Sequence, residues 1–409
     1  MKTLFSFLLL VFASSHALNA AEPTRTDLFT AGTHGFELYR IPGIVVTSKG
    51  TLLAYCEARR GDSDWTDERL VMRRSTDAGN TWSEQREVFT LPEPQPLNSL
   101  RVELRQAQTN DRTHHNLVLI PDRNGAVHAV FCVDYWRSFY SRSDDDGVTW
   151  SKPREINDVI AGYRAKDWNW RVVGNGCGHG LQLDNGRLLV PLWLSTATQP
   201  RGNGHRPSQV GVVFSDDHGA TWKIGDWVAK HSPELLTPNE TCAVQLSDGS
   251  VMFNIRHETT NRLRAVSVSR DGATSWSKPV FDEALFEPVC EASIIRLPKK
   301  STDDRKRILF CNPDSKPIEG KERPRRSNLT LKLSYDDAKT WPVQKVLEAD
   351  LAAYSDLAVA SDGTIYCLFE RGIVKVGTRS RTAAITVAKF DLNWLEGAGN
   401  TAARELPKR

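Results

Sequence analysis

The chain has 409 residues, of which 40% are hydrophobic and 25% are charged, as in an ordinary globular protein. Its 53 basic and 50 acidic residues give a formal net charge of +3, and this balance argues against a main role in binding nucleic acid or a membrane surface. The length suits one large all-β domain or two smaller domains.

The N-terminus is typical of a secretory signal peptide. Lys2 is the only charged residue before Glu22, and an apolar run over residues 4–13 is followed by small residues. The run is too short to span a bilayer. We therefore expect a signal peptide over residues 1–21, a mature protein over residues 22–409 without membrane insertion, and a secreted or periplasmic location. An uncleaved N-terminal anchor is the alternative.

One eight-residue motif recurs along the chain. In its template, Ser-x-Asp-x-Gly-x-Thr-Trp, the Asp can accept hydrogen bonds within a turn, Gly permits positive φ, and Trp anchors the turn on apolar neighbours. Three complete and two degenerate copies lie at Ser75–Trp82, Ser143–Trp150, Ser215–Trp222, Ser269–Trp276 and Ser334–Trp341. A strand-like run precedes each copy, so each predicts a β-hairpin corner. The spacing suits a four-stranded sheet that is repeated radially.

Other strand-like runs flank short turns that contain Gly, which is the usual hairpin signal. The predicted pairs are 44–46 with 51–55, 117–120 with 127–133, 181–183 with 188–194, 242–246 with 251–255, and 357–360 with 365–368. A last run over 383–390 could pair with residues 26–30 and close the ring. We expect no helix longer than about three turns, and we interpret the basic insert Lys316–Arg326 as a loop.

The seven cysteines are widely spaced and form no Cys-x-x-Cys pair. Most lie in apolar runs, so the pattern favours small buried side chains over metal ligands or a disulfide framework. One disulfide bridge remains possible.

With these repeats, the chain resembles the sialidase (neuraminidase) family of bacterial and animal type, over about residues 30–395. The resemblance implies an all-β fold in a single domain, a six-bladed β-propeller with Asp-box turns. Asp boxes also occur in other propellers and in carbohydrate-binding proteins. Function therefore depends on single residues at defined separations.

The first of these residues are arginines. A sialidase must hold a sugar whose anomeric carbon carries a carboxylate, and the planar guanidinium group suits this ligand. By the resemblance, Arg40 in Arg-Ile-Pro, Arg256 in Phe-Asn-Ile-Arg and Arg326 in Arg-Arg-Ser-Asn match the three binding arginines. Arg40 and Arg256 also interrupt apolar strands, where an unpaired arginine would be costly. Arg323 and Arg325 lie close enough to Arg326 for the register to slip.

Tyr354 matches the nucleophile of the family, 28 residues after Arg326. A neutral phenol avoids the repulsion that a carboxylate nucleophile would meet at the substrate's own carboxylate, and sialidases are an exception that uses tyrosine. Because a phenol has a pKa of about 10, it needs a base, and Glu240 matches that role. Without the resemblance, Tyr354 would be interpreted as a packing aromatic and Glu240 as part of a solvated turn or a glycosylation sequon.

The general acid is expected in the loop that follows Arg59, where Asp62, Asp64 and Asp67 are available. In the family an Asp follows such an arginine by about five residues, which favours Asp64 and leaves Asp62 as the alternative. Trp65 is an apolar neighbour that could raise the pKa of the Asp64 carboxyl. Arg59 itself either lines the sugar pocket or forms a structural salt bridge.

Glu370 resembles the acid that orients the first binding arginine, Arg40. The prediction is an exo-α-sialidase that removes terminal α-linked sialic acids from glycoproteins, glycolipids and oligosaccharides. It retains configuration through a tyrosyl–sugar intermediate and needs neither a metal nor an organic cofactor. The alternatives are a non-catalytic sialic-acid-binding propeller, and a hydrolase or transglycosidase for a related nonulosonic acid. Candidate sugar platforms, which could equally be blade packing, are Trp65, Trp136, Trp168 and Trp170.

Overall fold

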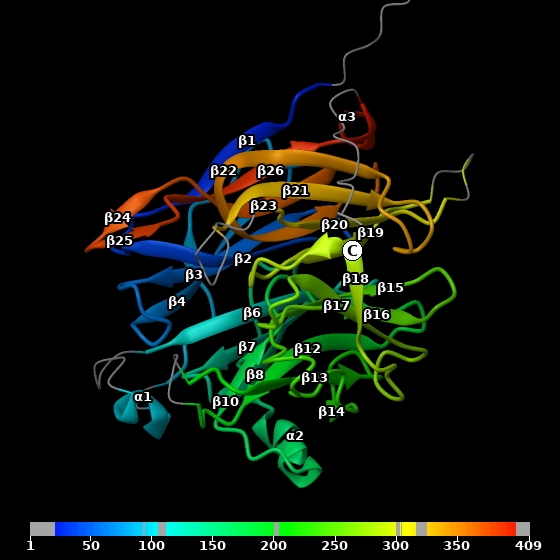
Figure 1. The fold of residues 1–409 in the computed structure, drawn as a ribbon. Coiled ribbons are helices and arrows are strands. Elements are labelled where there is room, and N and C mark those ends of the chain that lie inside the picture. Colours follow the sequence, from blue (N-terminus) through cyan, green and yellow to red (C-terminus); the bar gives the residue numbers. More distant parts are fainter. Residues whose placement is uncertain are drawn as a thin grey trace, which may run out of the picture.

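The computed structural model describes residues 21–92, 95–104, 112–199, 204–299, 303, 305–315 and 325–397. The predicted signal peptide therefore lies almost wholly outside the described residues, as does most of the Lys316–Arg326 insert. The described chain is an all-β protein whose strands form antiparallel sheets (Figure 1). No helix in this part of the chain is both long and apolar enough to cross a membrane.

Four sheets follow one another in chain order, and each is built mainly from strands that are consecutive in sequence. They contain β2 (Leu38–Val46), β3 (Leu52–Arg59), β4 (Glu68–Ser75) and β5 (Arg86–Glu87); β6 (His114–Pro121), β7 (Val127–Val133), β8 (Arg137–Ser143) and β9 (Arg154–Glu155); β10 (Val172–Asn175), β11 (Leu181–Gln182), β12 (Leu188–Ser195), β13 (Ser208–Ser215) and β14 (Lys223–Ile224); and β15 (Thr241–Gln245), β16 (Val251–Ile255), β17 (Leu263–Ser269) and β18 (Val280–Phe286).

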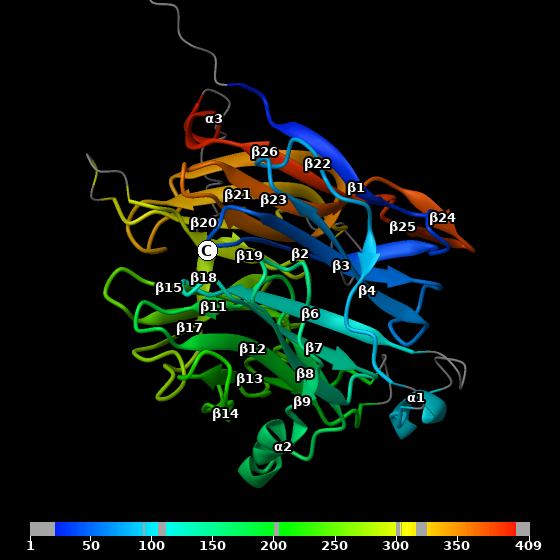
Figure 2. The same ribbon diagram turned by 180° about the vertical axis from the view of Figure 1, so that it is seen from behind.

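A seven-stranded sheet follows, because one long strand belongs to two groups of strands. Its order is β1 (Thr24–Thr30), β26 (Ala384–Phe390), β23 (Ile365–Arg371), β22 (Val343–Val359), β21 (Ser327–Ser334), β20 (Ile308–Pro313) and β19 (Ser293–Arg296). The first part of β22 pairs with β21, and its last residues pair with β23. The prediction of a strand over 357–360 was therefore too short. Both views show β1 beside β26 (Figures 1 and 2), which confirms the predicted pairing of the two chain ends.

The remaining elements are short. A hairpin is formed by β24 (Val374–Val376) and β25 (Arg379–Arg381), and the helices are α1 (Ser99–Glu103), α2 (Asn157–Ile160), a 3₁₀ helix (Ala161–Lys166) and α3 (Leu392–Glu396). No described helix exceeds the predicted limit of about three turns. All five predicted hairpins are present, as β2–β3, β6–β7, β11–β12, β15–β16 and β22–β23.

The five repeated motifs all connect the last two strands of a four-stranded group. In the second copy, Asp145 Oδ1 accepts hydrogen bonds from Ser143 Oγ and the Thr149 backbone N–H, each at 2.8 Å. Gly147 follows with φ +77°, in the left-handed region that glycine adopts without strain. The degenerate fifth copy has Ala338 at φ +63° and keeps the Asp–Thr bonds. The motif is therefore a self-contained hydrogen-bonded turn.

The tryptophans of these turns pack on the apolar clusters between neighbouring sheets, as predicted. Trp222 and Trp341 are buried, while Trp82, Trp150 and Trp276 are partly buried against such clusters. The seven cysteines are free thiols in the interior. The Sγ atoms of Cys311 and Cys367 come closest among those described, at 4.0 Å. The prediction of small buried side chains is thus confirmed.

Candidate active site

The residues that the sequence singled out meet at one cavity of about 620 Å³. Arg40 lies on β2, Asp64 in the loop from β3 to β4, Glu240 just before β15, and Tyr354 on β22, so residues more than 300 positions apart are brought together. The cavity is lined by Arg40, Ile41, Arg59, Asp64, Asn116, Tyr135, Trp193, His205, Arg206, Glu240, Arg256, Glu258, Arg326 and Tyr354. Seven of the eight predicted site residues line this cavity, and Glu370 lies behind its lining.

Two of these residues lie where a strand departs from regular pairing. The β2–β3 register shifts between Arg40 and Gly43, and Ile41 has φ +57°. The β22–β23 register shifts between Ala352 and Ser355, around Tyr354. A β-bulge bends its strand and redirects a side chain. These two irregularities explain how side chains from the otherwise regular strands β2 and β22 reach the same cavity.

Glu240 and Arg256 face each other across an extension of the β15–β16 hairpin. The Asn239 N–H donates to the Arg256 carbonyl at 2.9 Å, and the Arg256 N–H donates to the Glu240 carbonyl at 3.2 Å. The two side chains form an ion pair. Tyr354 Oη lies 2.6 and 2.7 Å from the two Glu240 carboxylate oxygens and accepts a hydrogen bond from Arg256 Nη1 at 2.8 Å. The phenol is thus held between a carboxylate and a guanidinium group.

Arginines also flank the ring of Tyr354. The guanidinium carbons of Arg40 and Arg326 lie 5.2 and 5.1 Å from its centre. Behind the cavity wall, Glu370 accepts from Arg40 Nε at 2.6 Å and from the Ile41 N–H at 3.0 Å. Arg40 is therefore held from behind by a fully buried carboxylate, in the contact that the resemblance implied.

The same arrangement determines the protonation of the phenol. Burial raises the pKa of Tyr354, and this effect exceeds the opposing charges of Arg256 and Arg326, so its pKa lies above the ordinary value. Tyr354 is consequently a neutral phenol in the free protein. Its nearest proton acceptor is the Glu240 carboxylate.

The two candidate acids, Asp64 and Asp62, lie in different surroundings, and only Asp64 is at the cavity. Asp64 lines the cavity and accepts a hydrogen bond from Arg59 Nη1 at 2.7 Å. Asp62 does not line it. Instead, its carboxylate accepts from Arg379 at 2.9 Å and from Arg381 Nη2 at 2.6 Å, both on the β24–β25 hairpin. This hairpin was not predicted, and its two arginines give Asp62 a structural ion pair.

Arg59 is the centre of a buried cluster of charges. Besides Asp64, it pairs with Glu57 and, through Nε at 3.2 Å, with Glu68. Burial acts to raise the pKa of Asp64, but the positive charge of Arg59, together with its hydrogen bond to the carboxylate, holds that pKa well below its usual value. The alternatives for Arg59 were pocket lining and a structural salt bridge, and its geometry combines both.

Sequence reasoning missed an aromatic wall on one side of the cavity. Trp193 and Tyr135 line it together with His205, whose ring centre is 4.8 Å from that of Tyr135 and 5.0 Å from that of Trp193. Burial lowers the pKa of His205 to about 4, against the opposing effect of Asp64, so its ring is neutral at pH 7. No motif marks these residues, because they come from three separate segments.

The four tryptophans proposed as sugar platforms do not line the cavity. Trp65 and Trp170 are buried, and Trp136 and Trp168 pack against an apolar cluster. They contribute to packing between sheets, which was the alternative to a role as sugar platforms. Among the three neighbouring arginines whose register was in question, Arg326 lines the cavity and Arg325 is exposed, while Arg323 lies outside the described residues.

Comparison with known proteins agrees with this geometry. Residues 94–367 match the model of the BNR repeat-like domain. The chain is 32% identical to a sialidase of Micromonospora viridifaciens over 387 residues, which cover 91% of the chain and 54% of that protein. The chain belongs to the sialidase family with BNR repeats. A sialidase of Bacteroides fragilis is 28% identical over 84% of the chain and 62% of its own length. The chain thus spans little more than half of these two relatives.

A solved structure shows the same fold. The Hadza microbial sialidase Hz136 superposes with a TM-score of 0.70 at 23% sequence identity, over 91% of this chain and 69% of that one. The family membership therefore rests on sequence, and the all-β architecture is shared with a solved sialidase.

Proposed function

We propose that this protein is an exo-α-sialidase that removes terminal α-linked sialic acids from glycoconjugates with retention of configuration, and that it acts after export from the cytoplasm. The observation that carries the proposal is the contact of Tyr354 Oη with both Glu240 and Arg256 at a cavity that Arg40 and Arg326 also line. The relatives named as sialidases support the substrate class.

Substrate binding depends on the arginines in this proposal. The sugar carboxylate lies among Arg40, Arg256 and Arg326, whose guanidinium groups offer paired N–H donors and a permanent positive charge. This places the anomeric carbon, which carries that carboxylate, beside Tyr354. The buried Glu370 keeps Arg40 pointed at the cavity. The aromatic wall of Trp193 and Tyr135 supplies apolar contact for the sugar.

In the first chemical step, Tyr354 Oη attacks the anomeric carbon and transfers its proton to Glu240. The bond to the leaving oxygen breaks, and Asp64 donates a proton to that oxygen. Asp64 must therefore be protonated, although Arg59 and Arg40 both lower its pKa in the free protein. The bound carboxylate neutralises part of the Arg40 charge, which removes one cause of this lowering and favours the acid form.

In the second step, Asp64 accepts a proton from water, which attacks the tyrosyl–sugar intermediate on the face that the leaving group vacated. The bond to Tyr354 breaks, and Glu240 returns the proton to the phenolate. Two inversions give net retention. Arg256, 2.8 Å from Oη, stabilises the phenolate as it leaves.

The proposed scaffold is a closed six-bladed β-propeller. The seven-stranded sheet divides at β22 into two four-stranded groups, which with the four sheets from β2 to β18 makes six. The pairing of β1 with β26 supports closure by both chain ends. Inner strands from different groups also line a common cavity, described below.

The direct test is release of a fluorogenic leaving group from an α-linked sialoside by the wild type and by Tyr354→Phe. We expect turnover by the wild type and a loss of at least about a thousandfold in the variant. Chromatography of the released sugar distinguishes hydrolysis from transfer. Binding of sialosides without any turnover would instead favour the non-catalytic alternative, and unchanged turnover by Tyr354→Phe would exclude this nucleophile.

A further inference from the structure

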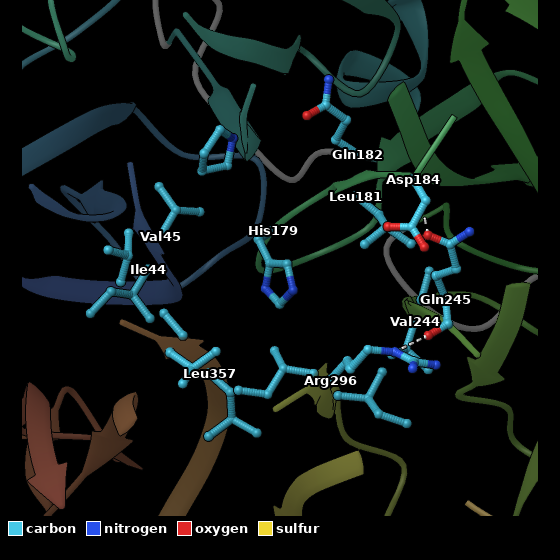
Figure 3. A pocket seen from close by; sticks show the side chains of 17 residues that line it. Ile44, Val45, His179, Leu181, Gln182, Asp184, Val244, Gln245, Arg296 and Leu357 are labelled. Atoms are coloured by element: carbon cyan, nitrogen blue, oxygen red, sulfur yellow. Dashed lines mark hydrogen bonds between the residues drawn. The ribbon is translucent and has the colours of Figure 1, made fainter. Parts of the chain in front are cut away.

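A second cavity, of about 270 Å³ (Figure 3), lies further along β2 and β22, the strands that carry Arg40 and Tyr354. On β2, Ile44 lines it four residues after Arg40, and on β22, Leu357 lines it three residues after Tyr354. At about 3.3 Å per residue, the two cavities are roughly 10–13 Å apart along the strands. The floor of the second cavity is apolar, with Ile44, Ile294 and Leu357 each at most 1% exposed.

One polar side chain, His179, enters this apolar floor. Its Nδ1 lies 2.7 Å from Asp356 Oδ1, and Asp356 also accepts hydrogen bonds from Ser293 Oγ and the Ile44 N–H, each at 2.9 Å. Gly178 has φ +74°, and a Cβ there would lie 2.8 Å from Asp356 Oδ1. A glycine is thus required for the close approach that positions the histidine. The ring is held by Asp356 on β22, and Asp356 is itself held by groups on β2 and β19.

This anchoring leaves the second ring nitrogen for a ligand. Nδ1 is engaged by Asp356, and within the described chain no hydrogen bond is made by Nε2. Figure 3 shows the ring between Ile44, Leu357 and Val244, directed into the space. Burial opposes the charged ring, yet the Asp356 carboxylate raises the pKa of His179 overall. Nε2 is therefore a donor in the charged ring and an acceptor in the neutral one.

The size and polarity of the space define the ligand. A cavity of about 150 Å³ holds benzene, so about 270 Å³ suits two fused rings. A hydroxyl group both donates and accepts, so it can pair with Nε2 in either state of the ring. The polar side chains of Gln182, Asp184 and Arg296 surround the mouth rather than the floor. We propose that this cavity is a second binding site, for a small two-ring alcohol whose hydroxyl pairs with His179.

The test uses calorimetric titration of the full-length protein with 2-naphthol, naphthalene and 2-naphthoate, in the presence of saturating free sialic acid. We expect saturable 2-naphthol binding that is about fivefold tighter than that of naphthalene, the value of one hydrogen bond. Equal affinity for these two, or tighter binding of 2-naphthoate, would overturn the assigned ligand class. The absence of saturable binding below about 1 mM, an affinity near −4 kcal/mol, would overturn the site.

Two variants locate the site. His179→Leu should make the affinities for 2-naphthol and naphthalene equal. Since it also leaves Asp356 without a partner, its fold is checked by circular dichroism. Leu181→Trp fills the space from a half-buried position on β11 and leaves that partner in place. It should weaken both ligands at least tenfold, and unchanged binding to this variant would overturn the proposal even if His179→Leu does not fold.

Discussion

The carboxylates of the repeated turns and those of the candidate active-site cavity differ in where their hydrogen bonds come from. In each turn, one Asp is satisfied within eight consecutive residues, as Asp77 is by Ser75 and Thr81. In the cavity, Glu240 contacts Tyr354, 114 positions away, and Glu370 contacts Arg40, 330 positions away. A turn of the first kind can be copied along a chain, whereas the second kind exists once and depends on the whole fold.

This difference assigns separate tasks to similar side chains. Each turn joins the last two strands of a four-stranded group, and its loss should lower stability while activity per folded molecule stays constant. Substitution of the cavity residues should instead lower activity per folded molecule and change stability little. Four experiments test that division, three of them with a matched control substitution.

The largest effect is expected from Glu240→Gln, which removes the proton acceptor of Tyr354. General base catalysis typically contributes 10²–10⁴-fold, so kcat should fall by about a thousandfold. Glu258→Gln is the matched control, because Glu258 lines the same cavity but pairs with Arg206 at 2.8 Å. Steady-state kinetics should show a loss of less than about tenfold for the control. Similar losses in both variants would contradict the assignment.

The next effect concerns the acid. Asp64→Asn should lower kcat/KM by about a hundredfold for a natural sialoside, and by much less for an aryl sialoside whose leaving group needs no proton. Asp62→Asn should change either rate only a few-fold, because Asp62 is paired with Arg379 and Arg381. Comparison of both substrates with both variants checks this. A larger loss in Asp62→Asn would reverse the roles.

A third experiment probes a buried histidine beside the cavity wall. Burial lowers the pKa of His115 to about 3, and its Nε2 accepts from the Tyr135 N–H at 2.7 Å. Between pH 6.5 and 3 the unfolded chain therefore binds a proton that the folded chain does not, so stability falls as pH falls. Urea unfolding should show His115→Gln losing up to about 1.4 kcal/mol less per pH unit than the wild type. Parallel pH profiles of the two proteins would contradict this.

The smallest effect is expected in a turn. Asp145→Ala removes the acceptor for Ser143 and Thr149 and should lower Tm by about 2–4 °C. The neighbouring Asp144→Ala loses one exposed contact with Arg142 and should leave Tm nearly unchanged. Calorimetry measures both. A loss of kcat in Asp145→Ala that exceeds the unfolded fraction would show that the turns do more than hold strands.

The sequence predicted the repeated part of the fold well, because each turn and hairpin carries its signal within a few residues. The pairing of β1 with β26 could also be inferred, from two strand-like runs at the chain ends. The length of β22 could not, since its first half is interrupted by charged residues such as Lys345 and Glu348 and is held by β21. The β24–β25 hairpin was missed because its strands have only three residues each.

Some residues of the candidate site could likewise be predicted from the sequence, and others could not. Arg40, Glu240 and Tyr354 were found because family motifs mark them at defined separations, and the structure brings them together. The choice between Asp62 and Asp64 was left open, because it depends on two arginines more than 300 residues away. The aromatic wall and its histidine carry no local signal, since ordinary core aromatics have the same sequence context.

The most direct test of the proposed chemistry is to trap the intermediate. In 2,3-difluorosialic acid, the fluorine on C2 is a good leaving group, and that on C3 slows both steps by destabilising a positively charged transition state. Intact-mass and peptide mass spectrometry of the treated protein should show one added sugar, on the peptide that contains Tyr354. An adduct on Glu240 or Asp64, or turnover of sialosides without any trapped adduct, would contradict the tyrosyl–sugar mechanism.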